Sequence, residues 1–138
     1  MENEIRVGMP LIITDEDIDD IISNALDWIS YWCRSVEVVG EYLGEYASEQ
    51  ISRGGELIFR CIEDPVDETP EILDYKLDRK KFIHAVDVWL SELDDDAKNE
   101  ILDKGFNYYG LELDVGQIDG PRSDAIIQLA LFNEVVFG

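Results

Sequence analysis

The sequence predicts an α+β fold: a single domain with a mixed or mainly antiparallel sheet covered by three to four helices. In some segments apolar residues recur at helical spacing, and between them lie short runs rich in β-branched and aromatic residues. The chain has 138 residues, of which 46% are hydrophobic, so it can bury one hydrophobic core. Because it shows no internal repeat and no linker, we expect residues 1–138 to form one acidic domain.

The N-terminal part of the chain predicts a short extended segment followed by a helix. The apolar residues of 4–13, interrupted by Gly8 and Pro10, are typical of an edge strand or of two short extended pieces. Thr14 then fits a helix N-cap, with Asp17 three residues later as in a capping box. Apolar residues recur at helical spacing over the following turns, so one face of this helix is expected to pack inward.

The next part predicts two strands with a short helix between them. Residues 31–41 and 57–62 are rich in β-branched and aromatic side chains, which favour strands. The short helix is expected at 47–53. Gly54 and Gly55 suit its end, because glycine adopts a left-handed backbone conformation without a steric penalty.

The second half of the chain begins with a predicted exposed loop at 63–74, which holds two prolines and six carboxylates. Asp78 fits the N-cap of a second helix that runs to about Leu93. The run Asp94–Asp96 predicts an acidic surface turn, and a shorter helix is expected at 97–103.

The C-terminal part predicts an extended segment, a helix and a last strand. Tyrosines and leucines favour an extended conformation at 106–115. Pro121 stands where the first turn of a helix tolerates proline, and this helix is expected to place Ile126 and Leu129 inward. Residues 134–137 are expected to close the sheet as its final strand.

The cysteines and the hydropathy pattern favour an intracellular protein. Cys33 and Cys61 form no closely spaced pair, so we expect two reduced thiols in or near strands. The sequence shows no apolar run of membrane-helix length and no secretion or lipidation signal. These observations predict the cytoplasm of the host cell as its compartment and exclude a membrane as a partner.

Charge is the most informative property of the sequence. The chain has 32 Asp and Glu against 11 Lys and Arg, a formal net charge of −21, which is about the charge of ten base pairs of B-DNA. Several acidic runs are expected to form a broad negative surface that repels nucleic acid and attracts the cationic groove of a basic nucleic-acid-binding protein. The residues expected to contact that partner are Asp15, Glu16, Asp17, Asp19, Asp20, Glu41, Glu45, Glu49, Asp94, Asp95 and Asp96.

Metal binding is not predicted. Asp15, Asp17 and Asp19 alternate as in a calcium loop, but Asp20 stands where that loop needs glycine and Leu26 where it needs glutamate. Two cysteines and one histidine provide no zinc-ligand spacing.

Catalysis is not predicted either. The lone histidine, His84, neighbours Lys80 and Lys81 on the second helix and is expected to be solvated rather than to act as a general base. No phosphate-binding glycine motif follows a predicted strand. We therefore expect no catalytic residue, no metal and no cofactor.

A small anion site is an alternative use of the few cations. Arg53 precedes Gly54 and Gly55, whose backbone amides can form a nest for a phosphate, although a helix stop with a surface arginine is the favoured interpretation. Arg122 lies near the N-terminus of the last helix. If these groups converge, Tyr42 and Tyr46 are the tyrosines expected to stack on an anionic nucleotide.

Three segments of the sequence resemble a known group of proteins. They are Tyr31-Trp32-Cys33 with the stretch VEVVGEYLGEYASEQISRGG at 36–55, the TDEDI motif at 14–18, and the ending DAIIQLALFNEVVFG at 124–138. They are similar to small acidic proteins of phages and mobile elements in Gram-positive, often intestinal, bacteria. The group has no settled activity, so it supplies no site residues. The resemblance implies a phage-accessory context, in which small acidic proteins often inhibit host defence nucleases.

Charge and resemblance together lead to a functional expectation. The first interpretation is a phage-encoded anti-defence inhibitor of the anti-CRISPR or anti-restriction type, a nucleic-acid mimic that occupies the groove of a defence nuclease. The alternatives are a binding module that sequesters an anionic signalling nucleotide, and a non-catalytic interaction protein of a mobile element. No direct binding of nucleic acid is expected, and a homodimer is left open.

Overall fold

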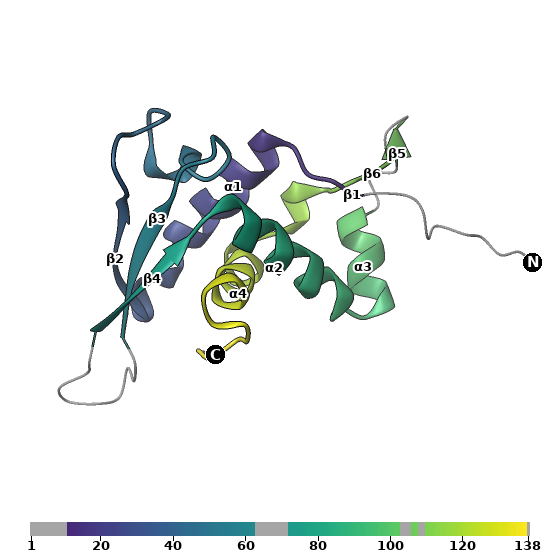
Figure 1. Cartoon of the computed structure of the whole chain (residues 1–138). Helices are drawn as coiled ribbons and strands as arrows, with labels where there is room; N and C mark the ends of the chain where they lie inside the picture. The colour runs from purple at the N-terminus through teal and green to yellow at the C-terminus, as the bar shows by residue number, and fades with distance from the viewer. Residues whose placement is uncertain (1–10, 63–71, 103–105, 108–109, 138) are drawn as a thin grey trace, which may run out of the picture.

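The computed structural model describes residues 11–62, 72–102, 106–107 and 110–137 and has the predicted α+β fold, with helices packed against an antiparallel sheet (Figure 1). The helices are α1 (Asp15–Leu26), α2 (Arg79–Ser91), α3 (Asp95–Leu102) and α4 (Gly120–Phe132). The antiparallel sheet has the strand order β2 (Cys33–Val38), β3 (Leu57–Ile62) and β4 (Ile72–Leu77). A second, mixed sheet joins β1 (Leu11–Ile12), β6 (Gly110–Glu112) and β5 (Phe106–Asn107), with β1 parallel to β6.

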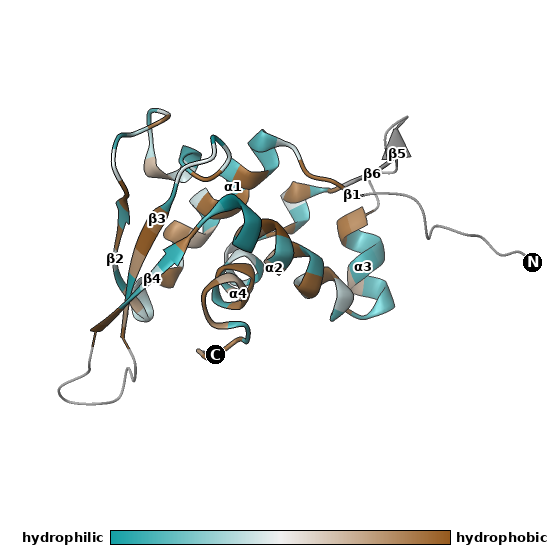
Figure 2. Cartoon of the chain, in the orientation of Figure 1, coloured by the Kyte–Doolittle hydropathy of each residue, from teal (hydrophilic) through white to brown (hydrophobic). Residues whose placement is uncertain are grey.

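The core lies between the antiparallel sheet and the helices. The central strand β3 directs Leu57, Phe59 and Cys61 into it, and these three residues pair in register with β4. Helix α4 packs against both α1 and α2. Figure 2 shows that α4 and β3 are mostly hydrophobic, whereas α1 carries hydrophilic residues beside its hydrophobic ones. A helix or strand that packs against neighbours on more than one side is expected to be mostly hydrophobic, and α4 and β3 fit that expectation.

The helix starts confirm the predicted caps. The Thr14 hydroxyl accepts from the Asp17 amide at 3.0 Å, and the Asp17 carboxylate accepts from the Thr14 amide at 3.1 Å. Asp78 accepts from the Lys81 amide at 2.8 Å and so caps α2. Each cap satisfies an amide that has no partner within its helix.

Two predicted segments in the first part of the chain differ from the structure, and a third lies mostly outside the described residues. Tyr31 and Trp32 do not belong to a strand: a 3₁₀ turn covers Ile29–Tyr31, and β2 begins at Cys33. Between β2 and β3 there is a 3₁₀ turn at Ala47–Glu49, followed by further turns, in place of a helix at 47–53. Of the predicted extended segment at 4–13, residues 4–10 lie outside the described residues.

Two further predictions were wrong. The predicted loop 63–74 ends inside strand β4, whose backbone pairs with β3, while 63–71 lie outside the described residues. Residues 134–137 form no strand, because Asn133 ends α4 in a left-handed conformation with φ 64° and the chain then folds back. Phe137 stacks on Trp32, with ring centroids 5.5 Å apart.

The acidic run after α2 also differs in detail. Asp94 accepts from the Ala97 amide at 2.8 Å, and α3 already begins at Asp95. Asp95 and Asp96 therefore stand in the first turn of a helix, where negative charge is favourable. None of the helices in the described part of the chain combines the length and hydrophobicity needed to cross a bilayer.

Candidate partner-binding surface

A loop between β2 and β3 presents carboxylates and large apolar side chains together. We call residues 41–46 (Glu41-Tyr42-Leu43-Gly44-Glu45-Tyr46) the acidic-aromatic loop. Tyr42 is 60% exposed, Leu43 47% and Tyr46 61%. Both glutamates of the loop are exposed as well. Solvated acids are ordinary, but exposed tyrosines among them are typical of surfaces that bind another protein.

Two side chains from the following turn hold the acidic-aromatic loop. Gln50, which is 1% exposed, accepts from the Leu43 amide and donates to the Glu41 carbonyl, both at 3.0 Å. Glu49 accepts from the amides of Glu45 and Tyr46 at 2.6 and 3.1 Å. These two amides hold the pKa of Glu49 below its usual value. The loop is therefore fixed by hydrogen bonds before any partner arrives.

Gly44 is needed for this arrangement. A Cβ atom at that position would lie 2.6 Å from the Glu49 Oε1 and 2.8 Å from the Arg53 Nε. Any larger residue would therefore push away the carboxylate that holds the loop.

The first turn of α1 lies beside the loop region. Helix α1 packs against the 3₁₀ turn at 47–49, and the Arg79 guanidinium donates to both the Asp15 carboxylate at 3.0 Å and the Ser52 carbonyl at 2.7 Å. In Figure 1 the start of α1 and the β2–β3 connection both lie at the upper edge. We call the exposed acids and apolar residues of these two neighbouring segments the acidic face, namely Asp15, Glu16, Asp20, Glu41 and Glu45 with Tyr42, Leu43 and Tyr46. Asp17 is left out because it is only partly exposed and its carboxylate caps α1.

The remaining predicted contact residues do not all lie on the acidic face. Asp19 is only partly exposed and one of its carboxylate oxygens is buried, while the Glu49 carboxylate is used within the loop. Asp94–Asp96 lie beyond the far end of α2, whose 13 residues span about 20 Å. The structure therefore separates the predicted acids into the acidic face and a second patch at the start of α3.

Cations in the described residues neutralise little of the acidic face. Arg60 pairs with Glu37 at 2.6 Å and with Asp74 at 3.4 Å, and Lys76 pairs with Glu56 at 3.8 Å. These pairs lie on the antiparallel sheet and beside it. On the acidic face, Asp15 has Arg79, and the described residues place no cation within ion-pair distance of the other carboxylates.

The backbone amides of Gly54 and Gly55 do not form the anion nest that the alternative site requires. The Gly54 amide donates to the Ile51 carbonyl at 3.0 Å and the Gly55 amide to the Gln50 carbonyl at 2.8 Å, so both end a turn. Tyr42 and Tyr46 belong to the acidic-aromatic loop, as described above.

The two arginines of that alternative are engaged by different segments. Arg53 lies against Gly44, whereas Arg122 donates to the Glu100 carboxylate at 2.7 Å and the Gln117 carbonyl at 2.8 Å. His84 is exposed on α2, as predicted. Within the described ranges no cluster of His, Cys, Asp or Glu could hold a metal ion.

A buried carboxylate was missed by the sequence analysis. Asp124 is 4% exposed and accepts hydrogen bonds from the Tyr31 hydroxyl at 2.6 Å, the Trp32 indole at 2.9 Å and the Gln128 amide at 2.8 Å. Burial, the hydrogen bond to Asp124 and the charge of that carboxylate raise the pKa of Tyr31 to about 12. Tyr31 therefore stays a donor at neutral pH. The available sequence signal was Asp124 and Gln128 at helical spacing in an apolar helix.

The cysteines confirm the prediction of free thiols near strands. Cys33 and Cys61 are buried and face each other across β2 and β3. A hydrogen bond between the two thiols lowers the pKa of Cys33 and raises that of Cys61. Both sulfurs therefore belong to the interior.

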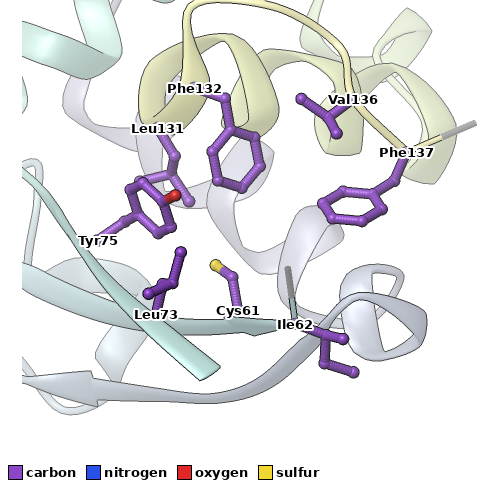
Figure 3. Close-up of a pocket in the computed structure, with 8 residues that line it drawn as sticks. All are labelled: Cys61, Ile62, Leu73, Tyr75, Leu131, Phe132, Val136 and Phe137. Carbon is purple, nitrogen blue, oxygen red and sulfur yellow. The ribbon is translucent and has the colours of Figure 1, made fainter. Parts of the chain in front are cut away.

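Cys61 also lines an apolar cavity of about 340 Å³, between the sheet and the end of α4 (Figure 3). Figure 3 shows Tyr75 and Phe132 next to each other on one side, packed edge to face with ring centroids 4.8 Å apart, and Phe137 on the opposite side. Apart from the Tyr75 hydroxyl and the thiol, the side chains that line it offer no polar group that could orient a ligand. This cavity therefore suits packing better than chemistry.

Comparison with protein-family models, with curated proteins and with solved structures gave no match. The resemblance to phage and mobile-element proteins stays a prediction. The strongest candidate for a functional surface is thus the acidic face, on geometry alone.

Proposed function

We propose that this protein is a non-catalytic inhibitor that occupies the cationic groove of a nucleic-acid-binding enzyme, as anti-defence proteins of the anti-CRISPR or anti-restriction type do. One observation carries the proposal: of the carboxylates on the acidic face, Asp15 alone has a cation partner among the described residues, and Glu49 and Gln50 hold the acidic-aromatic loop in place. Its carboxylates take the role of phosphates. The predicted setting is the host cytoplasm.

Electrostatics supports this proposal. A formal charge of −21 attracts a basic groove over about a Debye length, some 8–10 Å at physiological salt. The same field repels DNA and RNA, so the partner is expected to be the enzyme and not its substrate. Binding should be fast and strongly dependent on salt.

The apolar residues of the acidic face distinguish a specific inhibitor from a merely acidic protein. Tyr42, Leu43 and Tyr46 are half-exposed or more, and such side chains supply most of the binding energy when a partner excludes water from them. Charge would then set the rate of association, and these residues the lifetime of the complex.

The test is a pull-down from host lysate at low salt, eluted in parallel with buffer, duplex DNA and higher salt. The proposal expects a nucleic-acid enzyme that DNA releases. Retention of no such enzyme would overturn it.

A matched pair of variants then tests the surface. One replaces Glu16, Asp20, Glu41 and Glu45 by their amides. The control makes the same change at exposed acids outside the acidic face, namely Asp27, Asp87, Glu92 and Glu134. Both variants lose the same formal charge. We expect the first to weaken binding at least about tenfold more than the control, and equal losses would show that net charge alone acts.

A further inference from the structure

Asp124 lacks the cation that usually accompanies a buried carboxylate. All three of its hydrogen-bond donors, on Tyr31, Trp32 and Gln128, are neutral. Within the described ranges no Lys, Arg or His nitrogen pairs with it. Burying a charge is costly, and the three neutral hydrogen bonds offset only part of that cost, so a cation would stabilise the carboxylate further.

A cavity of about 460 Å³ gives access to this carboxylate. Its lining includes Trp28, Tyr31, Pro121, Asp124, Gln128 and Val135. Trp28 is 50% exposed, Tyr31 45% and Asp124 4%, so the two aromatic side chains are the solvent-exposed part of the lining and the acid is a buried part.

Backbone packing fixes one of these aromatic walls. The Trp28 ring covers Gly120, where an added Cβ atom would come within 2.6 Å of the indole carbon Cε3. The indole is therefore held against the start of α4, the helix that carries Asp124.

The chemistry of the lining selects a cation. Aromatic faces attract guanidinium and ammonium groups, and arginine stacks on them especially well because it is planar. Asp124 Oδ1 already accepts two hydrogen bonds and Oδ2 one, so Oδ2 can accept another. A neutral apolar ligand would leave that position and the charge unsatisfied.

We propose that this cavity is a socket for an arginine side chain of the protein partner, which stacks on Trp28 and pairs with Asp124. The socket rests on the proposed function, since a protein that binds nucleic acid through a basic groove displays arginines. It adds a point of specific recognition to the diffuse attraction of the acidic face.

The experiment titrates the intact protein with N-acetylarginine amide and, in parallel, with the citrulline analogue, which has nearly the same shape but no charge. Two-dimensional NMR follows the indole N–H signals of Trp28 and Trp32. We expect saturable shifts with arginine and none with citrulline. Equal shifts with both probes, or no shift with arginine, would overturn the socket.

Variants locate the binding. Asp124→Asn keeps the shape of the side chain and should abolish the arginine shifts, whereas Asp95→Asn removes the same charge at the start of α3 and should leave them unchanged. Trp28→Ala alters a half-exposed residue and should weaken binding about tenfold. Trp28→Ala keeps the socket testable even if Asp124→Asn fails to fold, and unchanged affinity in Trp28→Ala would contradict the proposal.

The two proposals fail in different ways. If a DNA-released enzyme is retained but arginine causes no shift at Trp28, the socket is wrong and the inhibitor function stands. If arginine binds and Trp28→Ala weakens it, but no enzyme is retained, the socket stands and the function is wrong.

Discussion

The carboxylates of the acidic face lie in water, whereas that of Asp124 is 4% exposed and accepts hydrogen bonds from three side chains. Exposed acids such as Glu16 and Glu41 act through a summed field, in which any one of them can be replaced by another nearby. Asp124 acts through geometry, because each of its donors needs an oxygen at one place. The same chemical group can therefore serve attraction in one region and architecture in the other.

The largest change in stability is expected from a substitution in the buried region. Asp124→Ala leaves the Trp32 indole without an acceptor inside the protein and leaves the Gln128 amide with the Phe137 carbonyl alone. We expect the free energy of unfolding to fall by about 3 kcal/mol. Glu16→Ala, the control on the acidic face, should change it by less than about 0.5 kcal/mol. Urea unfolding followed by tryptophan fluorescence measures both, and similar stabilities would remove the distinction between the two regions.

The next prediction compares the effects of replacing two buried glutamines. Gln128 accepts from the amides of Val136 and Phe137, and Gln50 holds the acidic-aromatic loop. Replacement of either by alanine should cost about 2 kcal/mol, since buried backbone groups lose their partners. Gln50→Ala should also weaken partner binding because it releases the loop, whereas Gln128→Ala acts at the socket and is the one of the two that should reduce the arginine shifts at Trp28.

Calorimetry and the pull-down separate these two effects. If Gln50→Ala lowered stability but left partner binding unchanged, the loop would not be the contact surface.

Local chemistry made part of this molecule predictable. Thr14 and Asp78 were recognisable as helix starts because a cap depends on residues three positions apart. The strand Ile72–Leu77 was not, because Asp74 and Lys76 are typical of a loop. Pairing with β3 makes this segment a strand, and that pairing is a property of the fold.

The candidate sites show the same limit. Composition predicted an acidic surface, and the structure divides it between the acidic face and Asp94–Asp96. In its network Asp124 contacts Trp32 and Tyr31, which lie 92 and 93 positions before it in the chain. No periodicity in the sequence encodes contacts at such a separation. Only the contact between Asp124 and Gln128, four residues apart on the same helix, corresponds to a local pattern in the sequence.

The smallest change in stability is expected at Glu49, whose carboxylate holds the acidic-aromatic loop. In the folded protein the amides of Glu45 and Tyr46 lower the pKa of Glu49 from its ordinary 4.5. A lowered pKa means that ionised Glu49 stabilises the fold above pH 4.5, and that this stabilisation is lost as the pH falls through the folded-state value. Glu49→Gln should therefore be less stable than the unmodified protein at neutral pH and approach it in acid.

Urea unfolding of Glu49→Gln across pH 2.5 to 7, a range chosen to span roughly both ionisation states, measures this dependence. Glu16→Gln serves as the control, since its carboxylate accepts no hydrogen bond from the part of the chain that the structure describes. If its difference from the unmodified protein followed the same pH profile, general charge repulsion would explain both variants. A profile seen with Glu49→Gln alone would mean that the charge of one acid beside the acidic face acts locally, on the two amides that donate to it, and not through the summed field.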